Sequence, residues 1–186
     1  MKKLSLLIII LIATCTVAMA QPRAIGGRLP ILSFGASYQH GIGEKNMLQA
    51  DIDLLDYWRG IQGTLTYNWL FPIKSWDVCN LNWYAGVGVG GGYAWRPLGW
   101  WGYGRYYYYG GYGYGYGGWK GYGYGFVGAA GMIGIECNFK FGLQVSFDYR
   151  PLIGPEIYKG GSAKYFVEGL YIGAINFGVR YKFGGK

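Results

Sequence analysis

Few side chains in this sequence are suited to catalysis. The chain of 186 residues has a single histidine, His40, and no G-x-S-x-G motif surrounds it. A general base must lie within hydrogen-bond reach of the group that it deprotonates, and nothing in the sequence pairs His40 with Ser37 or with a carboxylate. We interpret His40 as a residue at the rim of a strand and predict no enzymatic activity. No cluster of His, Cys and carboxylates has metal-ligand spacing, so we expect neither a metal site nor a cofactor.

Cys79 and Cys137 lie in segments that we expect, for reasons given below, to be neighbouring antiparallel strands. Both come near the same end of those strands, and a disulfide requires Cα atoms within about 7 Å of each other. Export of the chain would make a disulfide chemically accessible. The sequence leaves two alternatives open, a Cys79–Cys137 disulfide and two free thiols near a lipid boundary.

The segment 99–125 contains only five residue types: twelve glycines, ten tyrosines, three tryptophans, Arg105 and Lys120. Two cations in this stretch are too few for binding driven by phosphates, so we expect no nucleic-acid partner. Tyrosine offers a large amphipathic contact at low entropic cost, as in antibody paratopes. The segment could be a hairpin extension, a flexible loop or an adhesive surface, and we favour a hairpin extension with a binding role. The candidate binding residues are Trp100, Trp101, Tyr103, Tyr106, Tyr108, Tyr112, Tyr114, Tyr116 and Trp119.

Residues 1–20 predict a secretory signal peptide. Two lysines precede an apolar run at 4–13, and Ala18-Met19-Ala20 supplies an A-x-A cleavage site. A membrane span needs roughly 20 apolar residues, so the short run favours cleavage near Ala20 over an uncleaved anchor. A lipoprotein modified at Cys15 is a weaker alternative, because Thr14 is a poor fit to the small residue expected before it. The mature domain would be residues 21–186, with a net charge of +6 once the two lysines are removed.

Period-two alternation dominates the sequence after the signal peptide. Segments 64–69, 81–89, 142–150 and 175–183 each alternate apolar residues with polar residues or glycine. Such alternation predicts β-strands with two different faces. No other segment has an uninterrupted apolar run of helix length, which argues against a helical membrane protein. The pattern predicts an all-β protein.

Clusters of Gly, Pro, Asn, Asp and Lys divide the mature chain into eight expected strands. The connections after the second, fourth and sixth strands are short or moderate, and the connection after the fourth strand is 72–79. The connections after the fifth and seventh strands, 96–121 and 152–164, are long. Short turns at one end and long loops at the other are typical of outer-membrane barrels. The expected strands are 22–29, 31–42, 46–55, 60–71, 80–95, 122–139, 142–151 and 165–183.

The composition favours a membrane barrel over a soluble barrel or sandwich. Only 14% of the residues are charged, whereas a soluble sheet needs abundant charge on its outer face. In a transmembrane barrel, apolar residues face lipid while polar residues fill the lumen. Tryptophan and tyrosine near the expected strand ends suit the lipid–water boundary. We predict an eight-stranded antiparallel transmembrane up-and-down β-barrel in the bacterial outer membrane, with the 96–121 loop extracellular.

The polar positions of the expected strands would gather charged side chains in the lumen. Buried charges are tolerated when they are paired, and side chains just fill the interior of an eight-stranded barrel. We therefore favour a plugged lumen over a gated path for ions or protons. The predicted members of this lumen ion-pair network are Arg28, Asp51, Asp53, Glu136, Asp148, Arg150, Glu168 and Arg180.

Four motifs of the mature chain are shared with a known family: SYQHGIG at 37–43, NWYAGVGVGGG at 82–92, FDYRPLIGPEI at 147–157 and INFGVRYKF at 175–183. In this order they resemble the small eight-stranded outer-membrane β-barrel proteins common in Bacteroidetes, and the resemblance covers essentially the whole mature chain. It implies an OmpA-like or OmpX-like barrel inserted by the outer-membrane assembly machinery. The last strand in that family normally ends the protein at an aromatic residue. Phe183 matches this rule, but Gly184-Gly185-Lys186 follows it.

The function expected from these features is that of a structural or adhesive surface protein, built on a closed barrel and acting through the 96–121 loop. The alternative is a small gated pore for ions or small solutes, with the loop as its lid. Expected partners are outer-membrane lipid and lipopolysaccharide, the assembly machinery, and a surface glycan or protein bound by the loop. The sequence identifies no particular ligand.

Overall fold

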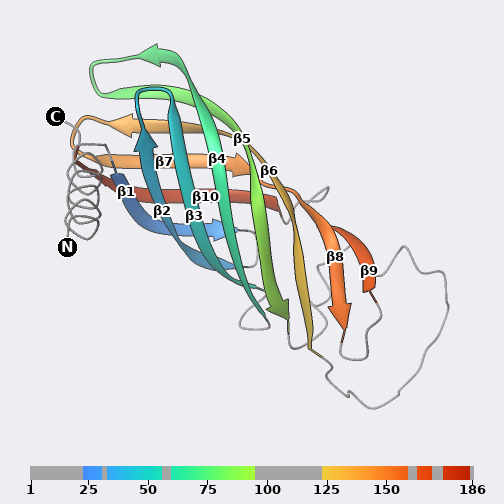
Figure 1. The fold of residues 1–186 in the computed structure, drawn as a ribbon. Helices are drawn as coiled ribbons and strands as arrows, with labels where there is room; N and C mark the ends of the chain where they lie inside the picture. Colours follow the sequence, from blue (N-terminus) through green and yellow to red (C-terminus); the bar gives the residue numbers. More distant parts are fainter. Residues whose placement is uncertain are drawn as a thin grey trace, which may run out of the picture.

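A computed structural model of the protein describes residues 23–30, 33–55, 60–94, 123–158, 163–168 and 174–184. These residues form a β-barrel in which every strand pairing is antiparallel (Figure 1). No helix in the described part of the chain is long and apolar enough to cross a membrane. The predicted all-β class and the eight-stranded up-and-down barrel are confirmed. The predicted signal peptide lies outside the described residues.

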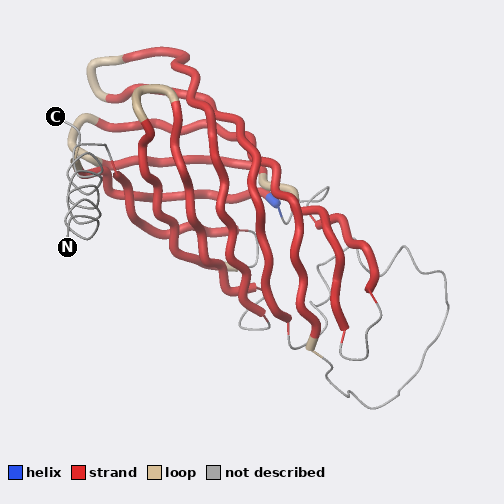
Figure 2. Tube along the Cα trace, in the orientation of Figure 1, coloured by secondary structure: helices blue, strands red, loops and turns tan. Residues whose placement is uncertain are grey.

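The barrel wall is built from ten strands, and Figure 2 shows the tight turns that join several of them. They are β1 (Arg23–Pro30), β2 (Phe34–Ile42), β3 (Asn46–Leu55), β4 (Gly60–Ser75), β5 (Cys79–Ala94), β6 (Tyr124–Phe139), β7 (Leu143–Tyr149), β8 (Leu152–Tyr158), β9 (Ala163–Glu168) and β10 (Ile175–Phe183).

Eight of these strands close the barrel, in the order β1-β2-β3-β4-β5-β6-β7-β10. The first and last of them, β1 and β10, pair from Arg23↔Phe183 to Pro30↔Asn176. β8 continues the line of β7 along β6, and β9 pairs with β8. The wall therefore has eight strand positions around its circumference. One of them is occupied by β7 and β8 in succession, and the next by β10 and β9.

Two expectations about the C-terminal part of the chain are wrong. The expected connection 152–164 contains β8, and the expected single strand 165–183 is divided between β9 and β10. Gly154 and Pro155 lie in this segment, and proline cannot donate a hydrogen bond to a strand ladder. In the structure Pro155 falls where the pairing of β8 with β6 is interrupted, between Ile153 and Glu156. The strand can therefore accommodate the proline at this point.

Three tight turns at residues 43–45, 76–78 and 140–142 define one end of the barrel, which we call the hairpin end. We call the opposite end the loop end. The β4–β5 hairpin projects beyond its neighbour at the hairpin end (Figure 1), because β4 pairs with β3 only as far as Trp69 but continues to Ser75. The moderate connection expected at 72–79 is thus mostly strand, with a short turn at its centre.

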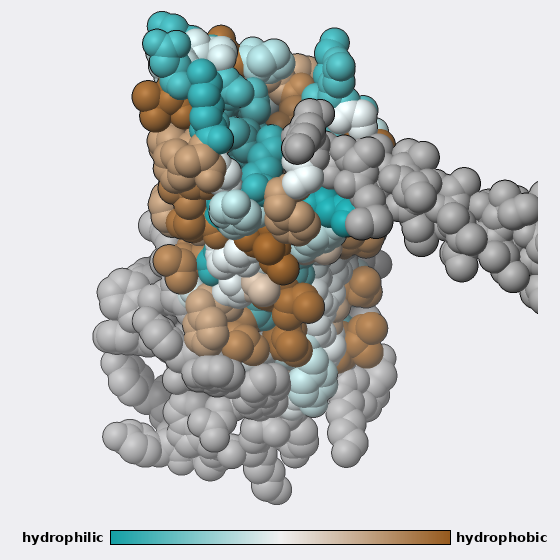
Figure 3. Space-filling view, turned by 90° about the vertical axis from the view of Figure 1, so that its left-hand side faces the viewer, coloured by the Kyte–Doolittle hydropathy of each residue, from teal (hydrophilic) through white to brown (hydrophobic). Residues whose placement is uncertain are grey.

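The two faces of the wall differ sharply in polarity. Large apolar side chains on the outer face are exposed, among them Ile52, Val87 and Val89, each about 60% exposed. The lumen side of the wall carries buried polar side chains such as Gln49 on β3 and Thr66 on β4. Figure 3 shows hydrophobic residues along the flanks of the barrel, with hydrophilic residues gathered at the top of the view. This distribution is the reverse of that in a soluble β-barrel.

Glycines in β5 and β6 leave room for large side chains in the narrow lumen. Gly134 is the cross-strand partner of Tyr84, and a Cβ added at Gly134 would lie 2.7 Å from the Tyr84 ring. Gly92 is paired in the same way with Phe126, whose ring would lie 2.6 Å from an added Cβ. Near the loop end the lumen is filled by an apolar cluster of Ala94, Tyr124, Phe126, Ala130 and Leu152.

Candidate functional site

The centre of the lumen holds a cluster of five buried charges, which we call the central cluster. Its members are Arg28 on β1, Asp51 and Asp53 on β3, Asp148 on β7, and Arg150 just after β7. Arg150 places Nη1 2.7 Å from Asp51 Oδ2 and Nη2 2.6 Å from Asp53 Oδ2. Arg28 pairs with Asp51, with Asp53 at 3.4 Å and with Asp148 at 3.5 Å. The two arginines thus bridge β3 to strands on other sides of the barrel.

The central cluster has three carboxylates for two guanidinium groups, and neutral donors stabilise the excess negative charge. Tyr84 Oη and Asn176 Nδ2 each donate a hydrogen bond to Asp148, at 3.1 Å. Gln49 Nε2 donates to Asp51 Oδ2 at 2.9 Å, and Gln39 Nε2 donates to Gln49 Oε1 at 2.9 Å. The charges are therefore embedded in a polar network that spans the lumen.

Two further predicted members, Glu136 and Arg180, lie in the lumen but make no ion pair with any described residue. Arg180 instead donates from Nε to Ser37 Oγ at 2.8 Å and from Nη1 to Ser146 Oγ at 2.7 Å. The Glu136 carboxylate accepts three amide hydrogen bonds, from Asn82 at 3.1 Å, Asn138 at 2.7 Å and Gln144 at 2.8 Å. Both charges are satisfied by neutral side chains.

The last predicted member, Glu168, ends β9, where its backbone pairs with Leu152. Its side chain lies outside what the structure describes. The uncharged part of the network, including Gln49, Tyr84 and Asn176, was not predicted. These side chains occupy the same alternating, lumen-facing positions as the charged residues, and that alternation was a usable signal.

Cys79 and Cys137 form a disulfide, with their Cα atoms 6.1 Å apart. Leu81 is the direct cross-strand partner of Cys137, so the disulfide runs diagonally between β5 and β6. Because Cys79 directly follows the β4–β5 turn, the disulfide connects the tip of the projecting hairpin to β6. Of the two alternatives that the sequence left open, the structure contains the bridged one.

His40 lies on β2 opposite Arg23, next to the turn of the hairpin end. Its Nδ1 atom is 3.3 Å from Tyr38 Oη. Ser37 is on the other face of β2, where it receives the hydrogen bond from Arg180. The two residues therefore do not form a nucleophile–base pair. Within the described ranges, no group of three or more His, Cys, Asp or Glu side chains could hold a metal ion.

The candidate binding residues between Trp100 and Trp119 lie outside the described residues. The structure does locate the strands that carry this loop. Ala94 and Tyr124 are cross-strand partners at the last described pair of β5 and β6. The loop therefore connects neighbouring strands at the loop end of the barrel, opposite the tight turns. Tyr124 itself belongs to the wall, because it is buried in the apolar cluster of the lumen.

Comparison with known proteins adds no family assignment. No protein-family description, no curated protein and no solved structure matches this chain. Arguments about function therefore rest on the geometry of the barrel and on the sequence.

Proposed function

We propose that the protein is a bacterial outer-membrane β-barrel with a closed lumen, acting as a structural or adhesive protein of the cell surface. The observation that carries the proposal is the inverted polarity of the wall. Exposed side chains such as Val87, Val89 and Phe147 would contact lipid, while the charged and amide side chains are enclosed in the lumen. Closure of the sheet leaves no lipid-exposed edge in the eight-stranded ring, as a membrane-spanning sheet requires.

The finer assignment within this proposal is a small barrel of the OmpA-like or OmpX-like type found in Bacteroidetes. Eight wall positions, short turns at one end and a terminal strand that closes against β1 all support it. Phe183, the last residue of β10, is the aromatic residue that such a strand carries near its end. In this arrangement the signal peptide is cleaved near Ala20, the assembly machinery inserts the barrel, and lipid and lipopolysaccharide surround it.

The ion pairs support a closed barrel rather than a pore. A conducting path through the central cluster would separate arginine and aspartate side chains that are at most a few percent exposed. Breaking a buried pair costs about 3–5 kcal/mol, so an open lumen with unpaired charges would be strongly disfavoured. We therefore assign the surface function to the 96–121 loop, whose tyrosines and tryptophans would bind a glycan or a protein.

Conductance of the refolded mature protein in a planar bilayer tests the closed lumen. Insertion is verified separately, by the shift in gel mobility between unheated and heated samples. We expect no reproducible single-channel steps. Steps that persist after the protein is purified again would refute the closed lumen and favour the small gated pore.

Replacement of the loop tests the surface role. Residues 99–121 are exchanged for a Gly/Ser linker of the same length, which spares Tyr124 and the wall. We expect the variant to fold with normal gel mobility and to lose binding of cells to host-cell or glycan surfaces. Normal binding by the folded variant would contradict a binding role for the loop.

A further inference from the structure

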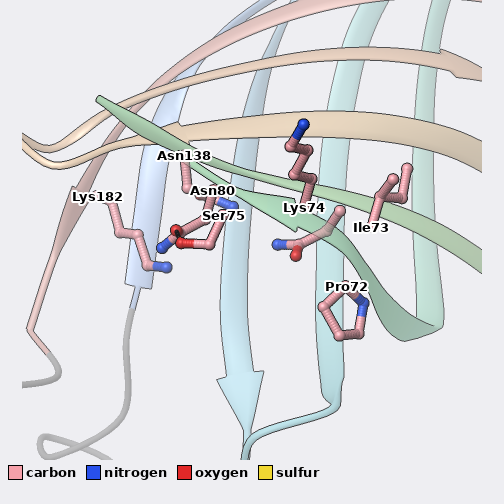
Figure 4. Close-up of a pocket in the computed structure, with 8 residues that line it drawn as sticks. Pro72, Ile73, Lys74, Ser75, Asn80, Asn138 and Lys182 are labelled. Atoms are coloured by element: carbon pink, nitrogen blue, oxygen red, sulfur yellow. Dashed lines mark hydrogen bonds between the residues drawn. The ribbon is translucent and has the colours of Figure 1, made fainter. Parts of the chain in front are cut away.

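The projecting β4–β5 hairpin borders an open pocket at the hairpin end, about 600 Å³ in volume. This is within the range of pockets that bind small organic ligands, roughly 300–1,000 Å³. β4 and β5 provide most of the lining, while Asn138 on β6 and Lys182 on β10 complete it from other parts of the wall (Figure 4). The disulfide at Cys79, next to the β4–β5 turn, fixes the tip of the hairpin against β6.

The pocket is positively charged. Lys74 and Lys182 line it, no acidic residue does, and neither lysine forms an ion pair with a described residue. Lys182 extends toward Ser75 and Asn80 in Figure 4. Glu136, deeper in the lumen, already accepts hydrogen bonds from three amides. The Lys182 ammonium group is thus available to a negatively charged ligand, whereas the Lys74 ammonium group lies over the Trp76 ring, 5.4 Å from its centroid, and points away from Lys182 in Figure 4.

The neutral side chains of the pocket leave both acceptors and donors for hydroxyl or amide groups. Asn138 uses its Nδ2 to bond Glu136, which leaves its Oδ1 buried and without a hydrogen-bond partner among the described residues. A buried amide oxygen without a partner is costly, so a donor from a ligand would stabilise it. Ser75 Oγ donates to Asn80 Oδ1 at 2.5 Å, and this leaves the Asn80 amide nitrogen free to donate.

Apolar atoms complete the lining. Pro72 and Ile73 border the pocket, next to the position where the β4–β5 register shifts. A ligand that satisfies the whole lining must carry an anionic group, hydrogen-bond donors and a compact face of C–H groups. A saccharide with a carboxylate has all three.

We propose that the pocket under the β4–β5 hairpin binds a carboxylate-bearing saccharide, with Lys182 as the anion contact and Asn138 Oδ1 as the acceptor for a hydroxyl or amide N–H. This site is separate from the 96–121 loop, which is connected to the opposite end of the barrel. The inference goes beyond the proposed surface function, and it can be tested on the full mature chain in detergent.

The test measures binding of three probes by calorimetry: N-acetylmuramic acid, the neutral sugar N-acetylglucosamine, and acetate. We expect N-acetylmuramic acid to bind at least tenfold more tightly than either of the others, and more weakly as salt is raised. Equal binding of the two sugars would overturn the role of Lys182. Equal binding of acetate would reduce the pocket to a simple anion site, and no binding of any probe would reject the proposal.

Substitutions then locate the site. Lys182→Met should weaken binding of N-acetylmuramic acid at least tenfold, whereas Lys140→Met, in the β6–β7 turn and outside the pocket lining, should leave it unchanged. Lys182→Gln provides a second pocket variant if Lys182→Met does not refold. Gel mobility of unheated samples verifies folding in each case. Equal effects of the pocket and control substitutions would show that only net charge matters and would refute the assignment.

Discussion

Removal of Arg150 from the central cluster tests whether charge pairing holds the lumen together. The guanidinium group makes two ion pairs, at 2.7 Å with Asp51 and at 2.6 Å with Asp53. A hydrogen bond to a charged group contributes about 1.5–3 kcal/mol, so the two together contribute about 3–6 kcal/mol. Because Arg28 still pairs with both carboxylates, we expect Arg150→Met to lower the free energy of unfolding by about 3 kcal/mol, near the low end of the range for broken buried pairs.

The charge balance of the cluster predicts a matched variant with a smaller effect. Arg150→Met leaves one guanidinium for three carboxylates, whereas Asp148→Asn leaves two of each. The asparagine oxygen can replace Oδ1 and accept from Asn176, and its amide nitrogen can donate to Tyr84 Oη, because a hydroxyl oxygen can also accept a hydrogen bond. We therefore expect Asp148→Asn to cost about 1 kcal/mol or less.

The assay is urea unfolding of the protein refolded in lipid vesicles, followed by tryptophan fluorescence and by gel mobility. The double variant Arg150→Met/Asp51→Asn completes the cycle, and its cost should fall short of the sum of the single costs by at least about 1 kcal/mol. If Asp148→Asn were as destabilising as Arg150→Met, charge balance would not govern the cluster. Additive costs in the cycle would likewise refute coupling between Arg150 and Asp51.

Three further predictions concern the wall. Cys79→Ala should abolish the mobility difference between reduced and non-reduced protein on a gel and cost about 2–4 kcal/mol, because the disulfide closes a loop between residues separated by 58 positions. Gly134→Val should cost about 1–3 kcal/mol in urea unfolding, because its Cβ would meet the Tyr84 ring at 2.7 Å; Gly63→Val, where the nearest atom lies 4.0 Å from an added Cβ, is the control and should cost less. Val87→Arg should destabilise the lipid-inserted barrel by about 2–4 kcal/mol if the outer face contacts lipid, and an equal loss in detergent and in vesicles would argue against that contact.

Much of the barrel could be predicted because its strongest signal is local. A strand places successive side chains on opposite faces, so period-two alternation reports the two environments directly. Segments such as 81–89 and 175–183 show this pattern without interruption, and both became strands. Segment 152–158 lacks a regular alternation, because Gly154 and Pro155 interrupt it. The segment forms a strand because it pairs with β6, and the local sequence does not indicate that the two segments are neighbours.

The lumen was predicted in part for the same reason. The alternation along each strand placed Arg28, Asp51 and Asp148 on the lumen face, but alternation does not indicate which of these side chains form ion pairs with one another. That depends on the register between strands and on closure of the ring. Arg180 and Glu136 illustrate the limit, because both point into the lumen, yet both are satisfied by serine and amide side chains rather than by opposite charges.

The sequence by itself determined the strand content, the polarity of the two faces and the set of side chains that share the lumen, since each follows from alternation along one strand. Only the tertiary structure decided the pairing of Arg28 with Asp148, 120 positions away, the bond between Cys79 and Cys137, and the pocket beneath the β4–β5 hairpin. These features bring together residues from different strands. Their geometry is fixed only when eight wall positions close on one another and set a single register.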